Sequence, residues 1–348
     1  MRIVQWEVPG QGRRVGVVVD GRVRDITAVR PEWQRTIDVF HAAGEQNRTL
    51  SEVLGPLASK ATETAYTLDD LLGARPGQDR PFVHAPLDHP DPHRVLLSGT
   101  GLTHTGSMQS RDEMHAAAQE AAEAPKSDSR KMFEMGLSGG RPEPGKRGVA
   151  PEWFYKGNGT NLRGHRQVLE VPDFALDGGE EPELVGCYVI DRDGTPCRLG
   201  FALGNEWSDH ATEKINYLYL APSKLRVCSV GPELITDGDF QSISLRCTVR
   251  RQSTVIYDSG VLYSGERHMC HSLANCEDHH FKYPQHRQPG DVHLHFFGTS
   301  KLSYGTRDWV YQDEDEVTVE APDFGAALVN SVRRNPRPEA TPIHVVPG

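Results

Sequence analysis

The segments GGEEPELVGCYVI (residues 178–190) and RLGFALGNEWSDH (198–210) carry the pattern that decides the fold. Each contains a short apolar run beside turn residues, which is typical of a buried strand. Glu181 and Glu183 stand two residues apart where the first strand starts, so we expect both carboxylates on one face of the sheet. Glu206 closes the second strand. Three converging carboxylates form an all-oxygen site that suits a hard divalent ion, with Mg²⁺ the natural choice and Mn²⁺ the alternative.

On the residues alone, Glu181 and Glu183 can also be interpreted as a solvated strand edge that binds no metal. Acidic pairs are common at solvated strand edges, and metal sites are rare.

Short apolar runs continue towards the C-terminus. They follow one another closely, which predicts an antiparallel or mixed β fold closed into a barrel, roll or sandwich. The clearest of them are ISLRCTVR (243–250), STVIYDSGVLY (253–263), DVHLHFF (291–297) and DEVTVEA (315–321).

Residues 1–92 predict a small N-terminal α+β domain. Asp20-Gly21 lies between VGVVV and RVRDI, a type I′ hairpin signal, and helical spacing follows in residues 33–43 and 50–61. Thr67 begins a short capped helix, TLDDLL, and the Pro/His-rich stretch 84–94 is typical of a linker. We therefore predict an α+β protein with this domain and a β-rich catalytic domain over 93–348.

The segment 109–150 has a different character. An Ala/Glu-rich helix is expected over 110–124, and residues 126–148 show no periodicity and many helix breakers. Such a segment is either a mobile lid or a surface loop without a role. GLSGG (136–140) fits a nucleophile pattern, but it lacks the strand–turn–helix that a Ser138 nucleophile requires.

Composition excludes several classes of function. The chain has 348 residues and a formal net charge of −10, which disfavours nucleic-acid binding. No apolar run predicts a membrane span or a secretory signal, so we expect a cytoplasmic protein. The six cysteines form no CxxC pair and are expected to be free thiols, and the cluster of cysteines and histidines over 270–280 matches no usual zinc spacing.

Six blocks over residues 151–330 occur in the order found in the fumarylacetoacetate hydrolase superfamily, which the chain resembles. The blocks are PEWFYKGNGT (151–160), EPELVGCYVI (181–190), GFALGNEWSDH (200–210), SKLRVCSVGPEL (223–234), PGDVHLHFFGTS (289–300) and EDEVTVEAPDFGAALVN (314–330). The resemblance implies a metal-dependent catalytic domain, a mixed β-sandwich roll, with Glu181, Glu183 and Glu206 as the metal ligands. The third ligand is usually Asp in that superfamily. Glu206 is one methylene longer, and the neighbouring Asp209 is an alternative.

The nearest likeness is to the 2-keto-3-deoxy-arabinonate dehydratase branch, and the chain is also similar to AraD1-like sugar-acid proteins. The likeness lies in PEWFYK and in NYLYLAPSK (216–224), and it implies Glu152 and Lys224 as the proton-transfer pair. A 2-keto acid that chelates a divalent ion has an acidic C3 proton. Removal of that proton and loss of the C4 hydroxyl would convert a 2-keto-3-deoxypentonate into 2-oxoglutarate semialdehyde.

The expected partner is a small 2-keto acid, and the superfamily implies a homodimer or homotetramer. A keto acid needs hydrogen-bond donors for its carboxylate and hydroxyls. The residues expected to bind it are Lys156, Asn158, Thr160, Ser208, Asp209, Thr299 and Ser300.

Rival functions share the metal site. The hydrolytic branch of the superfamily carries a His with a Glu three residues later; here His104 is followed by Ser107, so this dyad lacks its acid. A dyad of His104 with Glu113 or His115 would favour a hydrolase of 2,4-diketo acids instead. A keto-acid decarboxylase or isomerase, or a non-catalytic sugar-acid-binding protein, also remains open.

Overall fold

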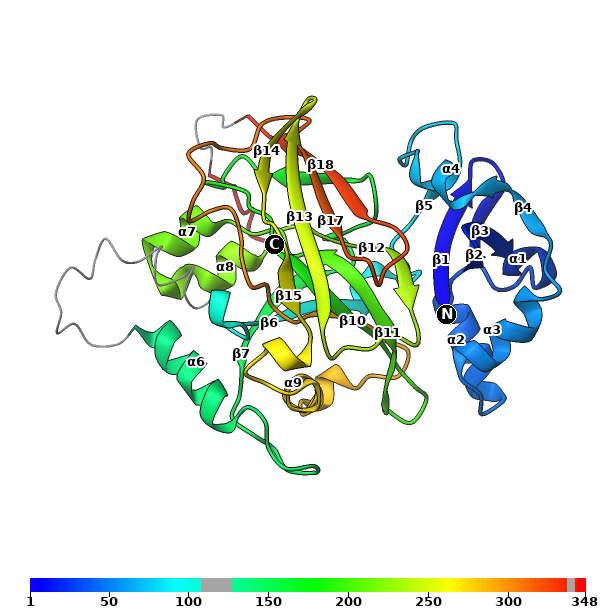
Figure 1. Cartoon of the computed structure of the whole chain (residues 1–348), viewed down its shortest axis with the longest axis horizontal. Coiled ribbons are helices and arrows are strands. Elements are labelled where there is room, and N and C mark those ends of the chain that lie inside the picture. Colours follow the sequence, from blue (N-terminus) through cyan, green and yellow to red (C-terminus); the bar gives the residue numbers. More distant parts are fainter. Residues whose placement is uncertain (108–126, 337–341) are drawn as a thin grey trace.

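Two β-sheets form the body of the protein in a computed structural model, which describes residues 1–107, 127–336 and 342–348 (Figure 1). In the larger sheet the strand order is β4-β3-β2-β1-β12-β11-β10-β16-β6-β7, with β5 beside β1 and β8 beside β12. These strands are β1 (Arg2–Val8), β2 (Gly12–Val19), β3 (Arg22–Asp25), β4 (Glu63–Thr67), β5 (Phe82–Val83), β6 (Val95–Gly101), β7 (Glu152–Asn158), β8 (Leu162–Arg163), β10 (Pro182–Ile190), β11 (Pro196–Asn205), β12 (Cys228–Ile235) and β16 (Val292–Phe296).

The smaller sheet has the order β14-β13-β17-β18-β9, and β15 pairs with β13. Its strands are β9 (Val168–Val171), β13 (Ile243–Arg251), β14 (Thr254–Asp258), β15 (Leu262–Ser264), β17 (Glu316–Glu320) and β18 (Leu328–Arg334). The helices are α1 (Ile26–Val29), α2 (Thr36–Glu45), α3 (Leu50–Ala58), α4 (Leu68–Leu72), α6 (Asp128–Gly139), α7 (His210–Ile215), α8 (Leu220–Lys224) and α9 (Leu273–Phe281).

A shared apolar core joins the two sheets. Leu184 and Leu203 of the larger sheet belong to the same buried cluster as Leu245, Val249 and Val317 of the smaller one. Full burial of each such side chain stabilises the fold by about 1.5–3 kcal/mol relative to exposure. The alternation of apolar and polar residues in the C-terminal runs thus produces a sandwich, and the predicted α+β class is confirmed.

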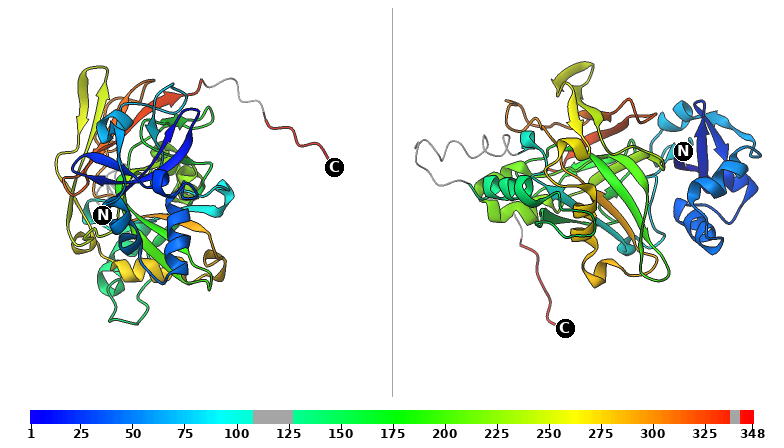
Figure 2. Two further views of the ribbon diagram at one scale, coloured as in Figure 1. Left: turned by 90° about the vertical axis from the view of Figure 1, so that its right-hand side faces the viewer. Right: turned by 60° about the horizontal axis from the view of Figure 1, so that its bottom comes forward.

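The N-terminal strands continue the larger sheet. Asp20 and Gly21 both have positive φ, 50° and 75°, so the turn between β2 and β3 is the predicted type I′ turn. β1 pairs antiparallel with β12, and Arg2 donates two hydrogen bonds to the buried Glu233 of that strand. The helices α1, α2 and α3 pack in the same lobe (Figure 2). The division into domains at residue 92 stays a prediction, but the sheet itself runs across it.

Residues 127–150 differ from the sequence-based expectation. The segment predicted to lack periodicity forms α6, whose first turn is capped by the Ser127 hydroxyl through the Arg130 amide. Gly136 lets this helix approach the body closely, because a Cβ there would lie 2.7 Å from the sulfur of Cys270. Gly148 is tied to Asn275 of α9. Residues 109–126, which include the expected Ala/Glu helix, lie outside the described residues, so the lid stays a prediction.

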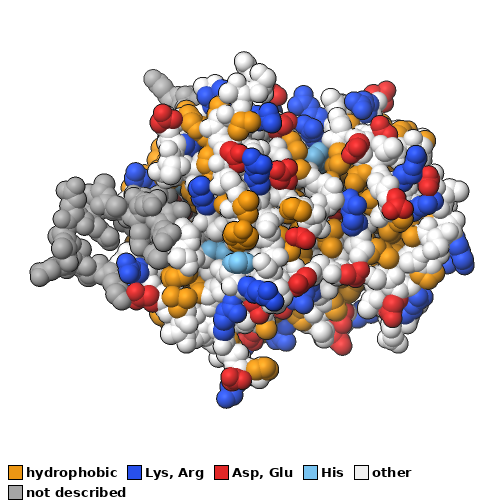
Figure 3. All heavy atoms as spheres, viewed as in Figure 1, with side chains coloured by type: hydrophobic (Ala, Val, Ile, Leu, Met, Phe, Trp, Pro, Cys, Tyr) orange, Lys and Arg blue, Asp and Glu red, His pale blue; other side chains and the backbone are white. Residues whose placement is uncertain are grey.

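The surface gives no sign of a membrane span. In the described ranges no helix is long and apolar enough to cross a bilayer. On the face shown in Figure 3, acidic and basic side chains are interspersed instead of forming a patch of one sign. All six cysteines are unpaired.

Buried histidines are concentrated beside β6 and β16. His295 bonds to Ser98 and Thr100, and His280 of α9 bonds to His293 at 2.9 Å. Burial lowers the pKa of His293 and His295 to about 3, and it lowers the pKa of His280 well below its usual value. His104, buried elsewhere on the chain, also has its pKa lowered to about 3 by burial. These imidazoles are therefore neutral in the folded protein near neutral pH.

We expect stability to fall steeply in mild acid because of these histidines. Above about pH 6.5, the usual pKa of histidine, these side chains are neutral in both the folded and the unfolded protein. Below that pH they become protonated in the unfolded chain but stay neutral in the folded protein. Each group then costs about 1.4 kcal/mol by pH 5.5, or roughly 4 kcal/mol for His104, His293 and His295 together. Urea unfolding at pH 7.5 and 5.5 measures this change. His295→Gln should make the pH dependence shallower, and the exposed control His93→Gln should leave it unaltered.

Candidate metal and keto-acid site

Three glutamates meet at the open end of the β10–β11 hairpin. The antiparallel register pairs Glu183 with Gly204, and the Glu206 amide donates to the Glu181 carbonyl at 2.9 Å. One carboxylate oxygen from each of Glu181, Glu183 and Glu206 lies within 4.8 Å of the others, and all three residues are buried. The local pairing of two neighbouring strands therefore brings together the carboxylates that the sequence predicted would converge.

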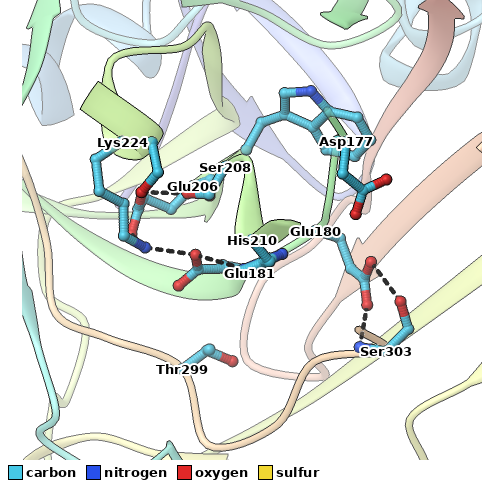
Figure 4. A network of polar contacts seen from close by, with 12 residues as sticks. Asp177, Glu180, Glu181, Glu206, Ser208, His210, Lys224, Thr299 and Ser303 are labelled. Atoms are coloured by element: carbon cyan, nitrogen blue, oxygen red, sulfur yellow. Dashed lines mark hydrogen bonds and ion pairs between the residues drawn. The ribbon is translucent and has the colours of Figure 1, made fainter. Parts of the chain in front are cut away.

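Two lysines neutralise part of this charge. Lys224 lies between Glu181 and Glu206, bonding to the first and to Oε2 of the second at 3.0 Å (Figure 4). Lys156 is fully buried and lies 2.9 Å from the other oxygen of Glu206. Glu183 accepts the Gly298 amide at 2.7 Å through Oε2, while its buried Oε1 has no hydrogen-bond partner among the described residues. Three carboxylates thus face two ammonium groups.

The pKa shifts follow from this arrangement. Burial and the charges of Glu206 and Glu181 raise the pKa of Glu183 well above its usual value. Burial also acts to raise the pKa of Glu181, but Lys224 and His210 outweigh it and hold this pKa below normal. Burial would lower the pKa of Lys224, yet Glu181, Glu206 and Glu213 raise it. The site is therefore short of positive charge at Glu183.

A divalent cation fits this deficit. Oxygens bound to one Mg²⁺ at about 2.1 Å are at most about 4.2 Å apart, so the observed cluster needs only small side-chain movements to close. The donor set is all oxygen and anionic, as Mg²⁺ and Mn²⁺ prefer. No other group of three His, Cys, Asp or Glu side chains in the part of the chain that the structure describes has its ligand atoms this close.

A small pocket, about 30 Å³ in volume, lies over the three carboxylates. Besides the glutamates and Lys224, it is lined by Gly101, Leu102, Ser107, His210, Glu213, Gly298, Thr299 and Leu302.

Glu152, the first residue of β7, contacts Gly101, which lines this pocket. β7 pairs with β6 so that Glu152 lies opposite Gly101, and the carboxylate is packed on that glycine. Its Oε2 accepts a hydrogen bond from the Tyr217 hydroxyl at 2.7 Å. The ammonium of Lys224 lies 4.8 Å from the ring centre of Phe154 on the same strand. Lys224 therefore lines the pocket directly, whereas Glu152 adjoins it through its contact with Gly101.

Comparison with known proteins gives matches by structure and not by sequence. No family model and no curated protein matches the chain. A 2-keto-3-deoxy-D-arabinonate dehydratase complexed with magnesium and 2,5-dioxopentanoate matches with a TM-score of 0.67 and 17% identity, over 97% of this chain and 100% of that one. A maleylpyruvate hydrolase from Sphingobium sp. SYK-6, in complex with manganese (II) ion and pyruvate, matches with a TM-score of 0.56 and 14% identity, over 96% and 99%.

The chain has the fumarylacetoacetate hydrolase fold. This confirms the fold that the six sequence blocks implied. The same fold is shared, at a TM-score of 0.52 and 17% identity, by a 5-carboxymethyl-2-hydroxymuconate delta-isomerase from Mycobacterium smegmatis, over 96% of this chain and 99% of that one.

Within the fumarylacetoacetate hydrolase fold, several predicted substrate contacts lie away from the pocket. Asn158 is six residues from Glu152, about 20 Å along the strand, and its side chain bonds to Thr160 and His93 in a turn. Lys156 is enclosed behind Glu206, where it also donates to the Trp207 carbonyl. Asn158 and Thr160 therefore belong to the turn, and Lys156 supports Glu206. None of the three lines the pocket.

The neighbours of Glu206 have supporting roles. Ser208 is fully buried and donates to Oε1 of Glu206 at 2.9 Å. Asp209 caps α7 through the Thr212 amide, accepts the Leu176 and Asp177 amides, and pairs with Arg226. Its carboxylate is committed to these bonds, so Glu206 and not Asp209 joins the cluster. Thr299 does line the pocket, whereas Ser300 is not among the lining residues.

His104, the candidate base for hydrolysis, is buried away from the opening. It is 2% exposed, bonds to Thr103 at 2.8 Å and to Ser264 at 3.3 Å, and does not line the pocket. Its suggested partners Glu113 and His115 lie outside the described residues. Ser138, the rejected nucleophile, lies in α6 and donates to the Met135 carbonyl.

Three further residues of the site were not singled out from the sequence. His210 bonds to Glu181 at 2.9 Å, Glu213 lines the pocket, and Tyr217 holds Glu152. All three lie between β11 and β12, where helical turns set which side chains point inwards. His210 ends the quoted block GFALGNEWSDH and Tyr217 belongs to the quoted block NYLYLAPSK, so these two residues lay in segments that carried the resemblance.

Gly101→Ala tests the packing of Glu152. A Cβ on Gly101 would lie 1.9 Å from Oε1 of Glu152, the flexible end of that side chain, so the carboxylate must move while the strands stay paired. For the expected 2-keto-3-deoxypentonate substrate, we expect kcat to fall on the order of 100-fold after a displacement of this size, while the affinity for Mg²⁺ stays unchanged. Steady-state kinetics and calorimetric metal titration measure the two quantities. Equal losses in both would contradict the role given to Gly101.

Proposed function

We propose that this protein is an enzyme, a metal-dependent dehydratase that converts a 2-keto-3-deoxypentonate into 2-oxoglutarate semialdehyde. The observation that carries the proposal is the convergence of three buried glutamates with Lys224 between two of them, beside a pocket whose lining residue Gly101 contacts Glu152. The structurally similar 2-keto-3-deoxy-D-arabinonate dehydratase was crystallised with magnesium and 2,5-dioxopentanoate, which is the semialdehyde expected here.

Glu181, Glu183 and Glu206 would hold the ion. When bound, a divalent ion supplies Lewis-acid polarisation of the keto and carboxylate oxygens of the substrate. Thr299 and the neighbouring backbone line the pocket and would orient the substrate. Leu102 and Leu302 on the same wall reduce the access of water.

Glu152 acts as the base in this proposal. Its carboxylate takes one proton from C3, the C4–O bond breaks, and Lys224 gives a proton to the departing hydroxyl, so that water leaves. The resulting unsaturated keto acid loses one proton from C5 and the proton of the C5 hydroxyl, and it gains one proton at C3 and one at C4, which converts the terminal alcohol into an aldehyde. Substrate and product then differ by one water molecule, and no oxidant or reductant is required.

The direct test is turnover with a defined substrate. Protein supplied with Mg²⁺ and 2-keto-3-deoxypentonate should form 2,5-dioxopentanoate, followed by NMR or by trapping of the aldehyde. If the protein binds the sugar acid but does not convert it, the dehydratase proposal is wrong and the protein is a non-catalytic sugar-acid-binding protein. Light scattering on the same sample would check the predicted homodimer or homotetramer.

Hydrolysis of 2,4-diketo acids is the second candidate. It is favoured by the structural likeness to maleylpyruvate hydrolase. The burial of His104 away from the pocket argues against it, because hydrolysis needs a base that can reach water. Cleavage of acylpyruvates faster than dehydration of the sugar acid would reverse this preference.

A further inference from the structure

One connecting segment, residues 209–224, reaches both halves of the site. It runs from the end of β11 to the start of β12 and contains α7 and α8. His210 and Lys224 contact Glu181 in the glutamate cluster. Tyr217, near the middle of the segment, contacts Glu152 on the separate strand β7. The segment therefore links the proposed metal ligands to the proposed base.

We propose that Tyr217 is a positioning residue for proton removal by Glu152. Its hydroxyl donates to Oε2 of the carboxylate at 2.7 Å, which fixes the rotation of the carboxylate and presents Oε1 at Gly101, on the pocket wall. This inference rests on the proposed function, since it assigns Tyr217 to the base of that reaction.

Two contacts together define where the carboxylate lies. On one side the absence of a side chain at Gly101 leaves room for Oε1, and on the other the Tyr217 hydroxyl holds Oε2. A glutamate side chain samples several rotamers in solution, and restricting it to one costs conformational entropy. A base must lie within about 2.6–3.2 Å of the atom whose proton it takes. A preformed hydrogen bond therefore removes part of this cost before substrate arrives.

The hydroxyl of Tyr217 is not what holds the segment in place. Asp209 anchors its start through backbone amides of residues 176, 177 and 212 and through Arg226. Asn216 caps the following 3₁₀ turn by accepting the Leu218 amide. None of these contacts involves the phenolic oxygen of Tyr217, so Tyr217→Phe leaves them intact.

The experiment compares Tyr217→Phe with Tyr219→Phe. Tyr219 lies in the same 3₁₀ turn and is 47% exposed, so it is a matched loss of one hydroxyl. Two rates are measured with Mg²⁺ present: dehydration of 2-keto-3-deoxypentonate, and exchange of the C3 protons of 2-oxobutanoate with D₂O, followed by NMR. The second reaction needs the base but has no C4 hydroxyl to lose.

We expect Tyr217→Phe to lower kcat and the exchange rate by about 10- to 100-fold, with KM and Mg²⁺ affinity changed less than about threefold. The deuterium isotope effect on kcat with substrate labelled at C3 should rise, since proton removal becomes slower. Tyr219→Phe should stay within about twofold of the parent protein.

Every other outcome contradicts the role of Tyr217, the dehydratase proposal, or both. Unchanged exchange in Tyr217→Phe, equal losses in both variants, or a change confined to KM overturns the role of Tyr217. If the parent protein exchanges C3 protons without dehydrating the sugar acid, the dehydratase proposal fails, and the role of Tyr217 is judged on exchange alone. If it does neither, both proposals fall.

Discussion

Glu152→Gln is expected to lower kcat for dehydration by about 10³-fold or more and to leave Mg²⁺ binding intact. General-base catalysis contributes about 10²- to 10⁴-fold, and an amide cannot accept the C3 proton. The substitution keeps the size of the side chain, and Gln still accepts the Tyr217 hydroxyl that Oε2 accepts now. Glu152 is not one of the clustered glutamates, so metal affinity should change less than about threefold. Steady-state kinetics and calorimetry measure both quantities.

A matched control is Glu170→Gln on β9. Glu170 is half-buried and paired with Arg333 at the surface, so the same change of charge there should leave kcat unaltered. Retention of most of the activity in Glu152→Gln would remove Glu152 from the mechanism. A parallel loss of Mg²⁺ affinity would show instead that the substitution disturbs the glutamate cluster.

Glu183→Gln should abolish metal-dependent activity without weakening the fold. Glu183 has a buried oxygen with no hydrogen-bond partner among the described residues, and a negative charge on Glu183 is repelled by the charges of Glu181 and Glu206. Removing that charge relieves repulsion, so the melting temperature of metal-free protein should stay the same or rise. Loss of one anionic ligand should weaken Mg²⁺ binding by at least about 100-fold, more than the 10- to 100-fold known for outer-shell groups. Thermal melts with and without Mg²⁺ test both parts.

The neighbouring Glu180 provides the opposite control. It is fully buried but turns away from the cluster, accepting the amide and hydroxyl of Ser303 and the hydroxyl of Tyr311 (Figure 4). Glu180→Gln disturbs this satisfied network and should cost about 1–3 kcal/mol of unfolding free energy while Mg²⁺ affinity is kept. Equal metal affinities for Glu183→Gln and the parent protein would contradict a metal site at these glutamates.

The glutamate cluster was predictable because strand geometry is regular. Residues two apart on a strand share a face, and an antiparallel neighbour brings the end of one strand to the start of the next. The position of Glu181 just before β10, of Glu183 on β10 and of Glu206 just after β11 follows from these rules. The roles of these residues in metal binding, and of Glu152 and Lys224 in proton transfer, stay predictions.

The rest of the site depends on contacts that sequence spacing does not reveal. The inward direction of His210 and Tyr217 depends on two short helical turns between β11 and β12. Asn158 and Thr160 were expected beside Lys156 because they are close in sequence, but they lie in a turn at the far end of β7, where they hydrogen-bond to each other. The helix α6 was missed because several glycines suggested a loop, whereas Gly136 allows close packing on Cys270.

The pairing of β1 with β12 has a consequence for anyone who shortens the chain. Without residues 1–92, the backbone groups of Leu234 and Ile235 that now face Ile3 and Arg2 would lie on an open edge. Unprotected edges of this kind recruit strands from other molecules and promote aggregation. The remaining part of the chain would also lose the guanidinium that pairs with the buried Glu233. A fragment without residues 1–92 should therefore precipitate or self-associate where the whole chain does not, as sedimentation of the two proteins side by side would reveal.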